Sequence, residues 1–140
     1  MANKVRELMS KGVVKLEARA TVLDAARKMA SSDIGALIVE ESGRLCGIVT
    51  DRDIVVRAVA DGKDPGQTPL SEVCSKNPLT LAPDDDLDRA VALMRDQKVR
   101  RVPVVDDKGM AVGVLSLGDL AIERDRKSVL GQISAAPPTH

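Results

Sequence analysis

The sequence predicts an α/β (α+β) protein made of two β-α-β-β-α repeats that pack sheet to sheet about a pseudo-twofold axis. Two observations lead to this prediction. The chain matches itself at an offset of 65 residues, so that Met29 meets Met94, and one extra turn residue raises the offset to 66, so that Asp53 meets Asp119. The same order of strand-like and helix-like apolar patterns runs through both halves. A repeat of about 55 residues is marginal as an independent domain, so the two copies are expected to pack together.

These patterns divide the 140 residues into four segments. The first repeat is expected to cover residues 5–60 and the second to cover residues 70–125. Residues 61–69 are rich in Gly, Pro and Asp, which is typical of a linker. Residues 126–140 are expected to form a C-terminal tail.

Each repeat opens with two short elements. The first is an amphipathic segment, residues 5–10 in one copy and 70–75 in the other. The second is a strand-like apolar stretch, residues 12–17 and 77–82. We therefore expect the first strand of each sheet to lie in these stretches.

A helix follows in each repeat, because apolar side chains recur at the i, i+3, i+4, i+7 spacing that places them on one face. In the first repeat these side chains are Val22, Ala25, Ala26 and Met29. In the second they are Leu87, Ala90, Val91 and Met94. Thr21 and Asp86 stand at the predicted N-cap positions, where a side-chain oxygen can accept from the backbone of the first turn.

A β-hairpin and a closing helix complete each repeat. A polar turn that contains Gly43 or Gly109 separates the two apolar runs of each hairpin. The predicted strands are residues 36–39 with 45–50, and residues 102–105 with 111–116. The closing helices are expected at residues 51–60 and 117–124.

Composition excludes several classes of function. Lys plus Arg (21) equals Asp plus Glu (21), so the chain lacks the positive excess that nucleic-acid binding requires. With 0% aromatic residues, it also cannot stack bases on rings. No apolar run approaches the ~20 residues of a membrane span, and the N-terminus has no signal-peptide pattern, so we expect a cytoplasmic protein.

The inventory of reactive side chains does not favour a catalytic function. The only histidine is the terminal His140 and there is no tyrosine, which leaves few candidates for a general acid or base. Cys46 and Cys74 lack the spacing of a disulfide framework or a zinc site, and are expected to be reduced thiols in or near the core. No metal site is predicted.

The junction between the last strand and the closing helix repeats a specific pattern. Each copy has a hydroxyl residue with an aspartate three positions later, Thr50 with Asp53 and Ser116 with Asp119. One interpretation is a capping box, although that motif prefers Glu or Gln to Asp. The other is a ligand site: free N–H groups at the helix start favour phosphate, the hydroxyl can donate, and the carboxylate can accept both hydrogens of a ribose diol. The pattern by itself leaves both interpretations open.

Residues 8–54, beginning LMSKGVVKLE and ending GIVTDRDI, resemble a CBS domain, the module named for cystathionine beta-synthase. Residues 73–120, beginning VCSKNPLTLA and ending GVLSLGDL, resemble a second copy. Together they resemble a tandem CBS pair, or Bateman module. This resemblance implies a disc-like pair, homodimeric, with clefts that bind adenine nucleotides or other adenosyl compounds, and without catalytic activity of its own.

The resemblance also implies roles for particular residues. The two corner aspartates would contact ribose, and the two corner hydroxyls would contact ribose or phosphate. Arg52 and Arg101 are candidates for a phosphate contact through the planar guanidinium. The first-strand segments would receive the base, and apolar side chains would form its wall because no aromatic ring is available. The candidates for these contacts are Val14, Thr80, Ile34 and Val99.

The predicted function is a regulatory sensor that binds an adenosyl ligand and transmits occupancy to an unidentified effector protein. The candidate ligands are AMP, ADP, ATP, S-adenosylmethionine and NAD, and no cofactor is required. Two alternatives remain at this level. One is a ligand-independent dimeric scaffold for stress response or interaction, in which the corners only cap helices. The other is a metal- or redox-responsive protein that uses Cys46 and Cys74.

Overall fold

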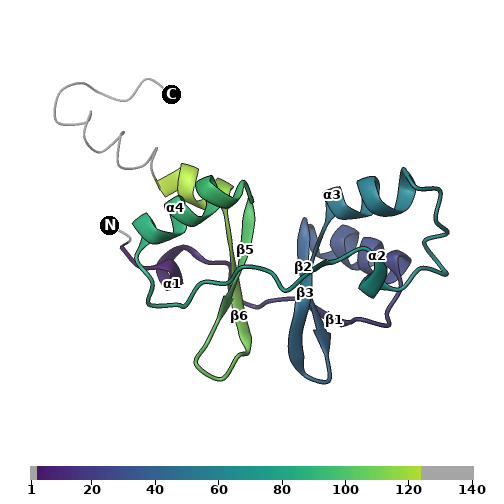
Figure 1. Ribbon diagram of the computed structural model, residues 1–140, viewed down its shortest axis with the longest axis horizontal. Coiled ribbons are helices and arrows are strands. Elements are labelled where there is room, and N and C mark those ends of the chain that lie inside the picture. Colours follow the sequence, from purple (N-terminus) through teal and green to yellow (C-terminus); the bar gives the residue numbers. More distant parts are fainter. Residues whose placement is uncertain (1–2, 124–140) are drawn as a thin grey trace.

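The computed structural model describes residues 3–123, and Figure 1 shows two similar lobes side by side. The expected tail at 126–140, the end of the closing helix at residue 124 and His140 lie outside the described residues. In the first repeat the elements are α1 (Val5–Leu8), β1 (Lys15–Glu17), α2 (Val22–Ser32), β2 (Ala36–Glu41), β3 (Arg44–Thr50) and α3 (Asp51–Asp53), which continues as a π-helical segment (Ile54–Val59). In the second they are a 3-10 turn (Leu70–Glu72), β4 (Ser75–Lys76), α4 (Leu87–Gln97), β5 (Arg101–Val105), β6 (Ala111–Ser116) and a helix at 117–123.

The hairpins confirm the predicted strand pairs. β2 pairs antiparallel with β3, and β5 pairs antiparallel with β6, each with one register shift near the end of the first strand. β1 lies parallel to β2, which gives the first repeat a sheet in the order β1-β2-β3-β4.

The predicted strand at residues 77–82 is wrong. Only Leu81 pairs with β5, through an isolated parallel bridge to Val104. Proline has no N–H to donate to a ladder, and Pro78 lies within this stretch while Pro83 follows it. The second sheet therefore contains β5 and β6 alone.

Helices α2 and α4 follow the predicted stripes, but their caps differ. Thr21 accepts from the Asp24 N–H at 3.1 Å while Asp24 accepts from the Thr21 N–H at 3.0 Å, a complete capping box. Asp86 occupies the N-cap position without a side-chain cap, because its carboxylate pairs with Lys4 at 2.8 Å instead. Both helices end at a residue in the left-handed conformation, at which the backbone leaves the helix.

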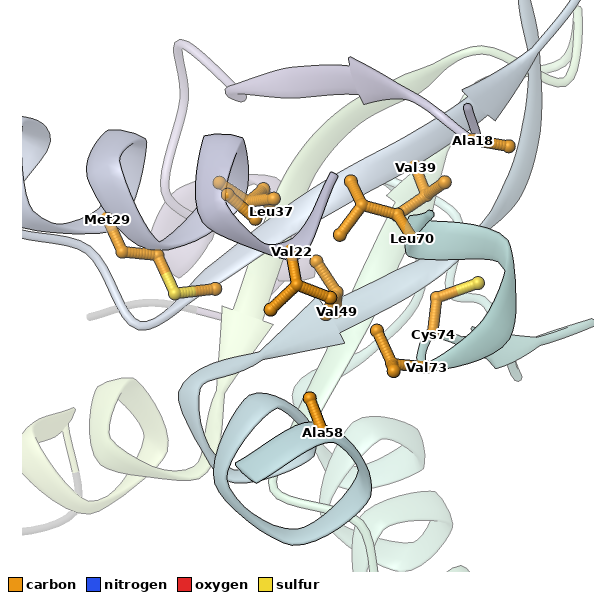
Figure 2. Close-up of a cluster of buried hydrophobic side chains, with 11 residues drawn as sticks. Ala18, Val22, Met29, Leu37, Val39, Val49, Ala58, Leu70, Val73 and Cys74 are labelled. Carbon is orange, nitrogen blue, oxygen red and sulfur yellow. The ribbon is translucent and has the colours of Figure 1, made fainter. Parts of the chain in front are cut away.

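The opening segment of each repeat packs into the other repeat. Val5 is completely buried in the core of the second repeat, where Ser10 forms a bridge with β6. In return, Leu70 and Val73 are completely buried in the core of the first repeat, and β4 pairs with β3 (Figure 2). The two repeats are therefore joined by an exchange of segments, which their order along the chain does not reveal.

Two equivalent glycines make this exchange possible. A Cβ on Gly47 would lie 2.4 Å from the carbonyl oxygen of Ser75, and one on Gly113 would lie 2.9 Å from the carbonyl oxygen of Ser10. These distances are shorter than any side chain tolerates, so only glycine lets the incoming backbone approach the strand.

The sheets of the two lobes face each other in the middle of the molecule, and the helices lie outside them, as Figure 1 shows. Leu37 and Val39 of β2 face the first core, whereas Ile38 between them points to the opposite face and is also fully buried. Pro103, its counterpart on β5, is buried too. Burial of both faces of β2 confirms the predicted sheet-to-sheet packing.

Candidate functional site

The first corner lies where β3 ends at Thr50 and α3 begins. The Thr50 N–H donates to Asp53 Oδ2 at 2.9 Å, and the Asp53 N–H donates to Thr50 Oγ1 at 3.1 Å. The Asp53 side chain is only 14% exposed. These two hydrogen bonds form a closed capping box.

The second corner has the same geometry. The Ser116 N–H donates to Asp119 Oδ2 at 3.0 Å, and the Asp119 N–H donates to Ser116 Oγ at 3.0 Å. The capping-box interpretation is therefore confirmed at both corners, with Asp at the position where the motif prefers Glu or Gln. The N-cap backbone is extended at Thr50 (φ −116°, ψ 164°).

The expectation of free backbone donors at the first corner is also wrong. The Asp51 N–H donates to the Gly35 carbonyl at 3.0 Å, the Arg52 N–H donates to Asp51 Oδ1 at 2.8 Å, and the Asp53 N–H donates to Thr50. A phosphate at this corner would therefore have to be held by side chains rather than by the start of the helix.

The capping box leaves polar capacity on the same residues. A carboxylate has two oxygens with about four acceptor sites, and only Oδ2 of Asp53 accepts from the N-cap amide. Its Oδ1 lies 3.9 Å from Arg57 Nε, at the limit of an ion pair. The Thr50 hydroxyl accepts one hydrogen bond in the box, and its own hydrogen can still be donated. The corner can thus bind a diol and an acceptor without losing its cap.

Arg101 of the second repeat reaches across to this first corner. Its guanidinium lies 3.5 Å from Asp51 Oδ1, and its side chain is 33% exposed. Gly35 leaves the space for it, since a Cβ there would lie 2.7 Å from the Arg101 Nη2 atom. The ion pair is long and Asp51 is 65% exposed, so the contact is worth at most about 1 kcal/mol, and the guanidinium is available to a stronger anion.

The two corners differ in charge. The repeat offsets place Ala36 at the position equivalent to Arg101, and Gly118 at the position equivalent to Arg52. Besides Arg57, which lies near Asp53, the first corner therefore has Arg52 in its own sequence and Arg101 from the other repeat. The positions equivalent to Arg52 and Arg101 carry no arginine for the second corner. This asymmetry is invisible when each repeat is compared with the motif alone.

The other predicted site residues divide between the two corners. Val14 belongs to the first repeat, where its carbonyl accepts from Ile38 at 3.0 Å on the edge of β2 opposite β3, and Ile34 precedes β2. Thr80 and Val99 belong to the second repeat, where Val99 packs against the second core and Thr80 is exposed. Arg101 alone belongs to one repeat and contacts the other.

Sequence reasoning missed Asp51 and Gly35, which position Arg101. The alignment of the two repeats contained a signal for this difference. Gly35 aligns with Arg100, so these two equivalent positions carry side chains of very different size. It also missed a cavity of about 610 Å³ at the far end of the β2–β3 hairpin. That cavity is lined by Glu41, Arg44, Leu45, Cys46, Ser71, Lys76 and Asn77.

The described residues contain neither a metal-binding cluster nor a membrane-spanning helix. Within residues 3–123, no group of three or more His, Cys, Asp or Glu side chains is arranged to hold a metal ion. Over the same range, no helix has the length and apolar character needed to cross a membrane.

The comparisons with known proteins agree with this architecture. A model of the CBS domain matches residues 5–59 and again residues 70–125. The chain is 39% identical over 122 residues to the CBS domain-containing protein YhcV of Bacillus subtilis (strain 168), which covers 87% of this chain and 86% of that protein.

Two solved structures are similar over most of the chain. The hexameric CBS-CP12 protein from bloom-forming cyanobacteria has a TM-score of 0.80 and 28% identity, covering 99% of this chain and 78% of that one. The CBS domain pair of protein MJ0100, in complex with 5′-methylthioadenosine and S-adenosyl-L-methionine, has a TM-score of 0.80 and 26% identity, covering 89% and 97%. The chain therefore belongs to the CBS domain family and carries two CBS domains in tandem.

Proposed function

We propose that the protein is a regulatory sensor whose first corner binds an adenosine ligand that carries phosphate. CBS domain pairs are commonly regulatory ligand-binding modules rather than enzymes. The observation that carries this more specific proposal is the Arg101 guanidinium, which reaches across from the second repeat to the corner formed by Thr50 and Asp53.

The polar groups of the first corner match the parts of such a ligand. Asp53 Oδ1 is the acceptor for the ribose diol, and the Thr50 hydroxyl is a donor. Arg101 and the exposed Arg52 supply positive charge for the phosphate, in the planar geometry that phosphate binds well. AMP, ADP, ATP and NAD fit this set better than a neutral adenosyl compound does.

The base would lie against apolar side chains. Val14 and Ile34 are both partly buried at the edge of the first core. The protein has no Phe, Tyr or Trp, so the adenine ring would contact aliphatic side chains. The polar edge of the adenine would form hydrogen bonds with backbone groups.

Occupancy can act on the arrangement of the repeats. A ligand held by Thr50 and Asp53 of one repeat and by Arg101 of the other favours the relative position in which all three reach it. A differential affinity worth ~1–3 kcal/mol is typical of such coupling. We propose that an effector protein in the cytoplasm responds to this change.

Self-association is part of the proposal. The closing helices expose apolar side chains, of which Val56 and Ile122 occupy equivalent positions, and both helices lie along the same edge of the molecule in Figure 1. The exposed residues are Val55, Val56, Val59, Leu117 and Ile122. Because the edge repeats itself about the pseudo-twofold axis, a second copy of the chain can meet it with the same surface, which makes a homodimer the proposed assembly.

A second candidate function is a ligand-independent scaffold. The closed capping boxes at both corners favour it, because they account for the conserved spacing of hydroxyl and aspartate within the two repeats without any ligand. The two functions differ in what a nucleotide does to the protein.

The deciding experiment is calorimetric titration of the purified chain with AMP and with adenosine. We expect AMP to bind more tightly than adenosine. Arg101→Gln should weaken AMP by roughly 10-fold or more, as expected for the loss of one charge-assisted contact, and leave adenosine unchanged. Arg100→Gln, which changes the neighbouring exposed arginine, is the matched control and should alter neither. Absence of binding of either compound at millimolar concentration would favour the scaffold.

A further inference from the structure

We propose that Cys46 and Cys74 are a redox modification site, at which a peroxide converts the two thiols into a reversible disulfide that joins β3 to the opening segment of the second repeat. The proposal does not depend on ligand binding at the corners. It rests on where the exchanged segments place the only two cysteines of the chain.

The two thiols meet where the repeats exchange segments. Cys74 follows the 3-10 turn and lies in the first core, 5% exposed (Figure 2). Its Sγ atom would be 3.2 Å from a Cβ on Gly47, so it lies against β3 directly beside Cys46. Cys46 packs against the same core, and it is one of the neighbours that raise the pKa of the Cys74 thiol. Residues 28 positions apart in the chain thus pack at the same core.

The two cysteines differ in access. Cys46 is partly exposed and lines the 610 Å³ cavity together with the basic side chains of Arg44 and Lys76. Cys74 is buried, and burial followed by the neighbouring Cys46 raises the pKa of its thiol. Access decides which of the two thiols a peroxide can reach. Cys46 is therefore the residue that meets the oxidant, and Cys74 is the residue that resolves the product.

The chemistry balances with hydrogen peroxide as the oxidant. The Cys46 thiolate attacks one peroxide oxygen, so that an S–O bond forms, the O–O bond breaks, and the departing hydroxide takes a proton to leave as water. Cys74 sulfur then attacks the sulfur of the sulfenic acid. The S–S bond forms, the S–O bond breaks, and the hydroxyl group leaves as water with the Cys74 proton. Two thiols lose two electrons in total, and one peroxide becomes two waters.

The disulfide would join the two repeats covalently. β4 begins directly after Cys74, pairs with β3, and leads into residues 77–82, which include Thr80. A covalent bond there closes a loop of the chain and fixes the second repeat's opening segment inside the first repeat. Cytosolic disulfides of this kind are transient and redox-sensing, which suits a regulatory protein.

The test is oxidation of the intact chain with a small molar excess of hydrogen peroxide, in the absence of nucleotide. Trypsin cleaves after Arg44, Arg52, Lys63 and Lys76, which releases residues 45–52 and 64–76 with one cysteine each. We expect mass spectrometry without reductant to find these two peptides joined, and dithiothreitol to separate them. The melting temperature, followed by circular dichroism, should rise by several degrees on oxidation and return on reduction.

Variants separate the outcomes. Cys46→Ser should abolish both the joined peptides and the rise in melting temperature, and Cys74→Ala should leave Cys46 to oxidise further without a cross-link. Cys46 is only partly buried, so Cys46→Ser remains informative if the Cys74 variant folds poorly. A peroxide-treated protein whose Cys46 is sulfinic acid with Cys74 still a thiol, or whose disulfide joins two chains on a non-reducing gel, would overturn the proposal. Either result leaves the nucleotide titration untouched.

Discussion

Replacement of Asp53 by asparagine separates the two roles that the first corner combines. The carbonyl oxygen of asparagine can still accept the Thr50 N–H, so the capping box keeps its two hydrogen bonds. In the absence of ligand, the variant loses only the negative charge at the start of α3 and the weak 3.9 Å ion pair with Arg57. We expect the free energy of unfolding to fall by about 0.3–1 kcal/mol, the usual value of a charge at a helix terminus.

The effect on the ligand should be larger. A carboxylate accepts both hydrogens of a ribose diol, whereas the amide has one acceptor oxygen, and the capping box already uses it. Loss of a charge-assisted contact costs about 1.5–3 kcal/mol, so AMP affinity should fall roughly 10- to 150-fold. Adenosine should weaken by the same factor, since the ribose is common to both, and this distinguishes Asp53 from Arg101. Isothermal titration of both compounds measures these changes.

Asp24→Asn is the matched control. Thr21 and Asp24 form a capping box with the same two hydrogen bonds at the start of α2, and neither residue belongs to the corner. This variant should lower stability to a similar extent and leave AMP binding unchanged. If Asp24→Asn and Asp53→Asn change AMP affinity equally, or if neither changes it, then Asp53 is only a helix cap and the proposed ribose contact is refuted.

Three further predictions test the fold, the assembly and the buried thiol. Gly47→Ala should destabilise the protein by about 1–3 kcal/mol in urea unfolding, because its Cβ would lie 2.4 Å from the Ser75 carbonyl oxygen and force β3 and β4 apart; an unchanged midpoint would mean that the exchanged segment does not pack closely in solution. Val56→Asp should shift the sedimentation coefficient from dimer to monomer, because Val56 is 48% exposed on the proposed interface; a variant that stays dimeric places the interface elsewhere. Burial raises the pKa of the Cys74 thiol from 9.0, so the stability that the neutral thiol contributes is present below that pH and lost as the pH rises through the higher folded-state value. Unfolding curves at increasing alkaline pH should show this loss in the wild type and a smaller one in Cys74→Ala, and identical pH profiles would contradict the assignment.

Local sequence patterns were sufficient to predict most helices and strands and to identify the family. The stripes of α2 and α4 and both hairpins lie where apolar periodicity predicts them, because helix and strand periods are properties of neighbouring residues. The strand predicted at 77–82 fails for a local reason as well, since its prolines remove donors that a ladder needs. The motif of hydroxyl and aspartate was found correctly, but its capping geometry depends on backbone angles that the letters do not specify.

The sequence by itself determined two tandem CBS domains, their repeat order and the pair of corners. Only the tertiary structure decided that Val5 is buried in the second repeat and Leu70 in the first. It also decided that Arg101 reaches the first corner, and that Cys46 and Cys74 pack at the same core. The physical reason is that each of these contacts joins residues far apart in the chain. Such a contact forms only where packed sheets and a glycine without a Cβ bring the two backbones within reach, and no pattern of neighbouring residues contains that information.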